Sequence, residues 1–254
     1  MTIEFLWVSR AQPTRGPKPA LTLEVITDAA IAIADREGLA AVSMQRVAAD
    51  LAFTKMSLYR YVPGKAELVA AMVERAIGEP PALDTASWRG GLKNWAHQLL
   101  AGYLRHPWAL EATVGPRAIG PNELGWMERG VTLLATTELT GSERLDALAL
   151  LTGHVRMIAQ QAGANRKPET QLITMIGELL SQHGERFPAL TATMASASDE
   201  GAQNQAFDFG LDRILDGLDL LTSERRWPIR PTGSIEADHG PDRSGPPPRP
   251  TGLG

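Results

Sequence analysis

Apolar residues recur at every third or fourth position along most of the chain, and alternation with a period of two does not persist anywhere. This spacing predicts amphipathic helices rather than strands, because residues three and four apart share one face of a helix. We therefore expect an all-α protein. The predicted helices cover residues 23–37, 44–51, 55–61, 65–77, 88–100, 108–114, 123–137, 142–161, 169–181 and 199–221.

Proline and glycine clusters divide the chain into four parts. Residues 1–20 contain three prolines and are predicted to form a flexible basic arm. Residues 21–78 hold short helices, and the sequence Gly-Glu-Pro-Pro that begins at position 78 separates them from the longer helices of residues 83–226. Residues 228–254 are rich in proline and glycine and poor in apolar residues, so we expect a disordered tail.

Each of the first three helices follows a residue suited to cap it. Thr22, Ser43 and Thr54 can accept hydrogen bonds from the free N–H groups of a first helical turn. Gly38 can adopt the left-handed conformation that ends a helix. The second and third helices are short and joined by a tight turn, which is the helix-turn-helix arrangement whose last helix enters the major groove of DNA.

The third helix has an apolar side and a polar side. Leu58 and Val62 can face inward, which leaves hydroxyls and cations outside, where they can bond to phosphate oxygens and base edges. The N–H groups at its start, near Thr54, suit a phosphate as well. Taken alone, a short Thr-capped helix with lysine and tyrosine is usually an ordinary surface helix. The first 65 residues carry a small excess of basic residues on an otherwise acidic chain of net charge −4, which favours DNA contact at the N-terminal end.

The composition excludes several classes of protein. The chain has no cysteine, so disulfide scaffolds, thiol nucleophiles and Cys-based zinc sites are excluded. Its five histidines form no HExxH motif or close metal pair, and no nucleophile elbow or Walker loop is present. We expect no metal, no cofactor and no enzymatic activity. No export signal or membrane-spanning run is found, so we expect a cytoplasmic protein without membrane contact.

Residues 21–77 resemble the TetR family of transcriptional regulators over their whole length. The matching segments are Glu37-Gly38-Leu39, Val42 to Ala48, Leu51 to Thr54, Ser57 to Val62 and Gly64 to Leu68. One departure is Ala52, where many relatives carry glycine in the turn, so this alanine must adopt a compatible φ angle.

The resemblance implies a role in DNA binding for a set of polar positions. Contacts to base edges are expected from Gln45, Lys55 and Met56, contacts to phosphates from Ser43, Ser57, Tyr59, Tyr61 and Lys65, and either kind from Arg60. Arg15 and Lys18 of the arm resemble residues that reach the minor groove or the backbone. The alternatives are packing for Tyr59 and Tyr61, simple exposure for Met56, and a solvated arm for Arg15 and Lys18.

Residues 83–165 resemble, more weakly, the regulatory domain of the tetracycline-repressor branch, which binds a small inducer. The carriers of this resemblance are Trp88-Arg89, His106-Pro107-Trp108 and Gly120-Pro121-Asn122. That branch ligates magnesium with a histidine just before a Gly-x-Arg turn, whereas this chain has Thr113 there, so magnesium–tetracycline is not expected. The candidate ligand-binding residues by position are Trp95, Leu99, Tyr103, Thr113, Arg117, Trp126, His154 and Met157.

Each of these eight residues has a structural alternative. Aromatic residues and methionine at helical spacing are ordinarily core, His154 can be a satisfied core histidine, and Arg117 can cap a helix end. The residues Phe207, Leu211, Ile214, Leu218 and Leu221 form a heptad-like seam, which can pack within the chain or across a two-fold axis. The resemblance implies that the helices over 142–161 and 199–221 build a four-helix bundle with a second subunit.

Together these features predict a homodimeric transcriptional repressor with an N-terminal helix-turn-helix domain and a helical domain for ligand binding and dimerisation. It would bind a palindromic operator in double-stranded DNA and be released by a small-molecule inducer. The alternative is a small-molecule-binding or interaction protein whose DNA-binding head is vestigial. Changes of Lys55, Tyr59 or Lys65 to alanine would separate the two, because only a true DNA-binding protein would lose affinity.

Overall fold

The computed structural model describes residues 4–7, 21–80, 82, 87–164, 168–199 and 205–226 of the 254-residue chain. Within these ranges every regular element is helical, so the predicted fold class is confirmed. The elements are α1 (Glu4–Trp7), α2 (Leu23–Glu37), η1 (Leu39–Ala41), α3 (Met44–Asp50), α4 (Lys55–Tyr59), α5 (Lys65–Ile77), α6 (Trp88–Arg105), α7 (Trp108–Ala112), α8 (Pro121–Leu134), α9 (Gly141–Ala164), α10 (Pro168–His183), η2 (Gly184–Arg186), α11 (Pro188–Asp199) and α12 (Ala206–Arg226).

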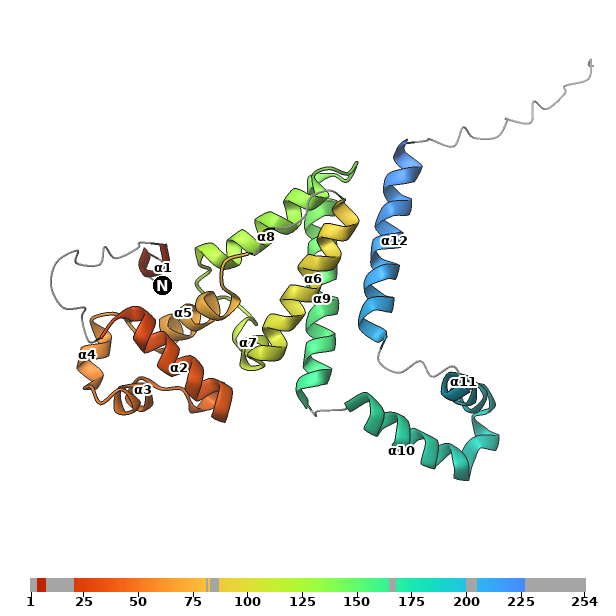
Figure 1. Ribbon diagram of the computed structural model, residues 1–254, viewed down its shortest axis with the longest axis horizontal. Coiled ribbons are helices and arrows are strands. Elements are labelled where there is room, and N and C mark those ends of the chain that lie inside the picture. Colours follow the sequence, from red (N-terminus) through yellow and green to blue (C-terminus); the bar gives the residue numbers. More distant parts are fainter. Residues whose placement is uncertain are drawn as a thin grey trace, which may run out of the picture.

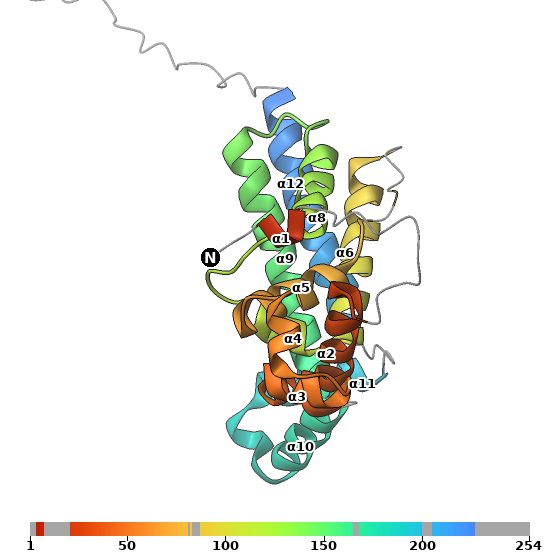
Figure 2. The ribbon, with the colours of Figure 1, turned by 90° about the vertical axis from the view of Figure 1, so that its left-hand side faces the viewer.

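Two groups of helices stand out, and α10 and α11 lie outside both (Figure 1). Helices α2–α5 make up the head at one end of the molecule, which is the part predicted to bind DNA, and α6, α8, α9 and α12 form the body beside it. In the view turned by 90°, α3 and α4 stand in front at the free end of the head (Figure 2). The helix-turn-helix therefore lies at the surface farthest from α12.

The head is built around one hydrophobic cluster. Ile26 and Ile33 of α2, Leu58 of α4 and Met72 of α5 are completely buried in it. Caps fix the helix starts, since the Oγ1 of Thr22 accepts the N–H of residue 25, as predicted. The cluster also takes in buried residues of α7, namely Trp108, Ala109 and Ala112, so a helix that follows α6 in the chain packs into the core of the head.

The body has a second cluster between α6, α8, α9 and α12. Leu92, Leu134, Leu151 and Leu211, one from each helix, are fully buried there. The partly buried seam residues Phe207, Ile214, Leu218 and Leu221 pack against the same cluster. The sequence left open whether this seam packs within the chain or across a two-fold axis, and in the structure it packs within the chain.

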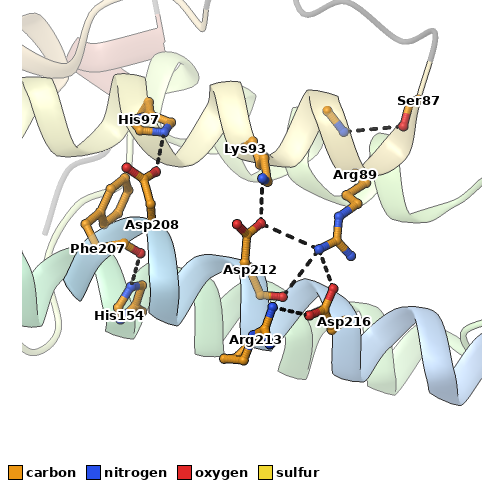
Figure 3. A network of polar contacts seen from close by, with 11 residues as sticks. Ser87, Arg89, Lys93, His97, His154, Phe207, Asp208, Asp212, Arg213 and Asp216 are labelled. Carbon is orange, nitrogen blue, oxygen red and sulfur yellow. Dashed lines mark hydrogen bonds and ion pairs between the residues drawn. The ribbon is translucent and has the colours of Figure 1, made fainter. Parts of the chain in front are cut away.

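A charged ladder also holds α12 against α6 (Figure 3). We use this name for the basic residues Arg89, Lys93 and His97 of α6 and the acidic residues Asp208, Asp212 and Asp216 of α12. Each set is spaced by four residues, so each lies along one side of its helix. Lys93 Nζ lies 2.5 Å from Asp212 Oδ1, His97 Nε2 lies 3.0 Å from Asp208 Oδ1, and Arg89 pairs with both Asp212 and Asp216.

Several predicted boundaries differ from the structure. Helix α8 begins at Pro121 after an N-cap at Gly120, so the predicted start at residue 123 is wrong and Asn122 lies inside the first turn. Proline suits this first helical position because it has no N–H to leave unpaired. Helix α11 was not predicted.

The two ends of the chain lie largely outside the described residues. The predicted arm does contain one helical turn, α1, whose Trp7 Nε1 donates to the carbonyl of Ile119 at 3.1 Å. The rest of the arm, with Arg15 and Lys18, and the predicted tail over 228–254 are outside the described part of the chain.

Candidate DNA-binding surface and ligand cavity

The recognition helix α4 is short and fixed by local hydrogen bonds. The Oγ1 of Thr54 accepts the backbone N–H of Ser57 at 3.3 Å, and the two hydroxyl oxygens lie 2.8 Å apart. Leu58 and Val62 are completely buried and anchor the inner side of this segment, as predicted. The opposite side of α4 is thereby turned to solvent.

The predicted DNA-contacting residues of the head lie on one exposed region around α3 and α4. The exposed positions are Gln45, Thr54, Lys55, Met56, Tyr59, Arg60 and Lys65, and the partly buried ones are Ser43, Ser57 and Tyr61. Met56 is an apolar side chain that is 73% exposed, which makes it available to a groove. The Nζ of Lys55 lies 5.6 Å from the centroid of the Tyr59 ring, so the cation and the ring share one side of the helix.

The turn between α3 and α4 has a strained residue. Ala52 has a φ of +57°, and it is the only non-glycine residue with a positive φ in the described ranges. The left-handed conformation brings Cβ too close to the following carbonyl, which is why glycine is favoured there. The turn therefore keeps the left-handed backbone that glycine would adopt, although this chain has alanine at position 52.

Helix α5 connects the head to the body through polar contacts at both sides. Arg75 pairs with Asp28 of α2, with its Nη2 2.7 Å from Oδ2, and this hydrogen bond raises the pKa of Arg75. On the body side, the Glu74 carboxylate accepts the backbone N–H groups of Asn122 and Glu123 at the start of α8, the second at 3.2 Å. Trp126 Nε1 donates to the carbonyl of Gly78 at 3.1 Å. The end of α5 is thus attached to α8.

A cavity lies at this junction of head and body. It contains about 470 Å³ of empty space, including the open solvent at its mouth. Helix α5 forms one wall, and the other walls come from α6, α7 and α8. Its lining residues are Val73, Ala76, Ile77, Gln98, Leu99, Gly102, Tyr103, His106, Ala109, Thr113, Glu123 and Trp126.

Four of the eight predicted ligand-binding residues line this cavity, namely Leu99, Tyr103, Thr113 and Trp126. Arg117 lies directly behind the lining, where it pairs with Glu123 and donates to the carbonyl of Thr113 at 3.2 Å. Burial lowers the pKa of Arg117. Its pairing with Glu123 offsets the negative charge of a carboxylate in the cavity wall.

The other three predicted ligand-binding residues do not line the cavity. Trp95 is buried in the body core and donates to the Trp126 carbonyl at 3.0 Å. His154 Nε2 lies 2.9 Å from the Phe207 carbonyl and its ring stacks on Phe207, so it is the satisfied core histidine that we weighed as the alternative. Met157, on the same helix as His154, is 48% exposed.

The sequence reasoning missed the contributions of α5 and of His106 to this cavity. Val73, Ala76 and Ile77 read as ordinary core of a head helix, and only the tertiary packing turns them toward α6 and α8. His106 follows α6 and belongs to the His106-Pro107-Trp108 segment that resembles the tetracycline-repressor branch, but it was not among the predicted ligand-binding residues. A histidine beside the helix break at Pro107 was the available signal.

The residues present do not fit the magnesium ion of the tetracycline-repressor branch. The hydroxyl of Thr113 donates to the Ala109 carbonyl at 2.6 Å and contacts the guanidinium of Arg156. That guanidinium also donates to the hydroxyl of Tyr103 at 3.1 Å. A cation is therefore already held at the position where that branch has its ligating histidine, and it would repel a divalent ion.

The chain matches two family models that together cover most of it. Residues 26–72 match the bacterial regulatory proteins of the tetR family, and residues 80–221 match the tetracyclin repressor-like C-terminal domain. The division between the matches falls at the end of α5, where the head meets the body. The predicted N-terminal helix-turn-helix and the predicted helical C-terminal domain are thereby confirmed.

The similar proteins include regulators from two Streptomyces species. The transcriptional repressor DrrR1 of Streptomyces coeruleorubidus is 39% identical over 246 residues, which are 91% of this chain and 89% of that protein. Apo ActR of Streptomyces coelicolor matches 82% of this chain and all of its own, with a TM-score of 0.71 and 25% identity. ActR in complex with actinorhodin matches 81% of this chain and 98% of its own, with a TM-score of 0.67 and 25% identity.

Across the parts of the chain that the structure describes, no helix is both long enough and apolar enough to span a membrane. The matched families consist of regulators rather than enzymes. The exposed helix-turn-helix, the helical body with its cavity, and the two family matches lead to one assignment. The chain belongs to the TetR family and is a helix-turn-helix transcriptional repressor.

Proposed function

We propose that this repressor binds a palindromic operator as a homodimer and is released when a small molecule enters the cavity between α5 and α6–α8. One observation carries this proposal: α5, the last helix of the DNA-binding head, is also a wall of the cavity. A ligand that favours one position of α5 over another changes the population of DNA-binding states. A cytoplasmic location follows for a protein with this role.

The ligand that the cavity suits is largely apolar and aromatic, with a few hydrogen-bonding groups. Leu99, Trp126 and the α5 residues supply apolar surface, while Gln98, Tyr103 and His106 supply polar groups at fixed positions. The complex of ActR with actinorhodin supports a ligand role for a body of this fold. The Arg117 cation pairs with Glu123 in the wall. The guanidinium of Arg156 contacts the lining residues Tyr103 and Thr113, so this side of the cavity suits a hydrogen-bond acceptor.

The surfaces proposed for dimerisation are the outer sides of α9 and α12. Leu145 and Met157 of α9 and Phe209 and Leu220 of α12 are large apolar side chains that are about half exposed or more. Small residues at 149, 153 and 217 lie between them and would allow close helix packing. A two-fold pairing of these faces would bring two heads onto successive major grooves.

DNase footprinting on the DNA upstream of the gene tests the proposal, with and without candidate ligands. We expect protection of two half-sites whose centres lie about one helical turn, or a multiple of it, apart. Lys65→Ala should weaken protection, whereas Arg129→Ala, which removes an exposed cation from the body, should leave it unchanged. Absence of protection at every salt concentration would leave the small-molecule-binding protein with a vestigial head as the remaining interpretation.

A further inference from the structure

His106, which follows α6, and Trp108, the first residue of α7, bind the same oxygen atom in the head. Asp35 lies near the C-terminal end of α2, and its Oδ1 contacts His106 Nδ1 at 2.9 Å and the indole Nε1 of Trp108 at 2.7 Å. Trp108 is buried in the core of the head, whereas His106 is also part of the cavity lining. One imidazole therefore touches both the head and the ligand cavity.

We propose that His106 and Asp35 link cavity occupancy to the position of the DNA-binding head. In this role Asp35 is a positioning residue, and His106 is a ligand-contacting residue that acts on the head through it. The inference rests on the proposed function and adds to it the pair of side chains that carries the signal. It also predicts which ligands act: those that place a hydrogen-bond donor at the ring of His106.

The hydrogen bond between His106 and Asp35 decides that the ligand donates, rather than accepts, at the imidazole ring. An ionised carboxylate only accepts hydrogen bonds, so Nδ1 of His106 donates to Asp35. In the neutral imidazole, Nε2 is then an acceptor, and a hydroxyl or N–H of the ligand can donate to it. A ligand that pulls or turns the ring changes the Nδ1 contact, because both nitrogens belong to one rigid ring.

Asp35 is well placed to move the head. It lies on α2, and Arg75 of α5 pairs with Asp28 on the same helix. Helix α2 therefore receives contacts from the cavity side through His106 and from the wall helix α5 through Arg75. A change at Asp35 shifts the helix on which α3 packs, and through α3 it moves α4 and the spacing of two heads in a dimer.

The test uses the full chain and an operator duplex that the wild-type protein selects from a random library. His106→Phe keeps a ring and removes both nitrogens, and Asp35→Asn removes the charge while keeping an oxygen acceptor. His97→Phe is the matched control, because it also removes a histidine–aspartate contact of the same region, but its partner Asp208 lies on α12. Circular dichroism and thermal unfolding check that each variant folds.

The first measurement follows the ring itself. Histidine side chains are labelled with 13C and 15N, and their resonances are recorded with and without the selected duplex. Because coupling between two sites is reciprocal, operator binding should shift the His106 signals. The Asp35→Asn variant should lose that shift. Unchanged His106 signals, or an equal shift in Asp35→Asn, would overturn the proposal.

The second measurement uses actinorhodin, the ligand of the ActR complex, as the probe. The ratio of operator Kd with and without the probe should fall at least about fivefold toward one in His106→Phe and Asp35→Asn, while His97→Phe keeps the wild-type ratio. His106→Asn should regain part of the ratio, because its amide nitrogen can take the place of Nδ1. Equal ratios in all variants would contradict the link.

The outcomes separate this inference from the proposed function. If the library yields no enriched duplex, operator binding itself fails, and the inference fails with it. If a duplex is enriched and bound but His106 gives no response, only the inference fails. If actinorhodin does not release the wild-type protein, the resonance measurement with the duplex still decides the role of the pair.

Discussion

The carboxylate of Glu74 accepts the backbone N–H of Asn122, so a residue of α5 supplies the cap for the first turn of α8. The side-chain amide of Asn122 in turn donates a hydrogen bond to the backbone carbonyl of Glu74 at 3.0 Å. Because no side chain caps α8 from its own loop, the start of this helix depends on the position of α5. The two structural parts that the ligand is proposed to couple therefore already share a helix terminus.

Glu74 should make stability depend on pH. Burial raises the pKa of Glu74, although the Asn122 hydrogen bond opposes this. The folded state then holds its proton to higher pH than the unfolded chain, so stability falls as the pH rises from the unfolded pKa through the folded one. Glu74→Gln has no titrating group here and does not lose stability in this way. Its unfolding free energy, compared with that of wild type, should therefore increase as the pH rises between the two pKa values of Glu74.

Urea unfolding at a series of pH values from about 4 upward measures this difference. Glu79→Gln is the control, because Glu79 is exposed just beyond the end of the same helix. A constant difference between Glu74→Gln and wild type over the whole series would show that Glu74 titrates alike in both states.

Ala52→Gly should stabilise the head by about 0.5–1 kcal/mol, because glycine relieves the left-handed strain at a φ of +57° at some cost in chain entropy. Ala49→Gly, at an exposed position inside α3, should instead destabilise it by about 0.5–1 kcal/mol. Chemical denaturation measures the unfolding free energy of both variants, provided that the dependence of this free energy on denaturant concentration has the same slope as in wild type. Equal destabilisation by the two changes would argue that the turn holds no strain.

The DNA-binding surface should divide into positions that set affinity and positions that set sequence preference. Lys65→Ala should weaken binding to all duplexes alike and reduce the slope of log K against log salt by about 1. Gln45→Ala or Lys55→Ala should cost about 1–3 kcal/mol at particular base pairs and relax the preference there. Titration of a duplex set at several salt concentrations distinguishes these results; a uniform loss for Gln45→Ala would assign it to the backbone contacts.

The charged ladder should make the attachment of α12 sensitive to salt and acid. The hydrogen bond from Lys93 lowers the pKa of Asp212, so its contribution is present at neutral pH and is lost as the pH falls through the lowered pKa. Asp212→Asn should lower the melting temperature at low salt, and the difference should shrink near 1 M salt because screening weakens exposed pairs. Asp219→Asn, on the same helix but outside the ladder, is the control for this comparison.

The sequence by itself determined the helical class, the starts of α2, α3 and α4, and the two buried anchors of the recognition helix. These features depend on local physics, namely the periodicity of apolar residues and the match of Thr22, Ser43 and Thr54 to the free N–H groups that follow them. The outer surface of α4 follows directly, because burying Leu58 fixes which side faces solvent.

Only the tertiary structure decided where the cavity lies and what connects it to the head. Contacts such as Glu74 with Asn122 or Asp35 with His106 join residues far apart in the chain, and no periodicity encodes them. The same reason explains the placement of His154 and Trp95, since an aromatic residue at helical spacing can face either a cavity or the core. In the folded chain His154 faces α12 and bonds to the Phe207 carbonyl, and Trp95 faces α8 and donates to the Trp126 carbonyl.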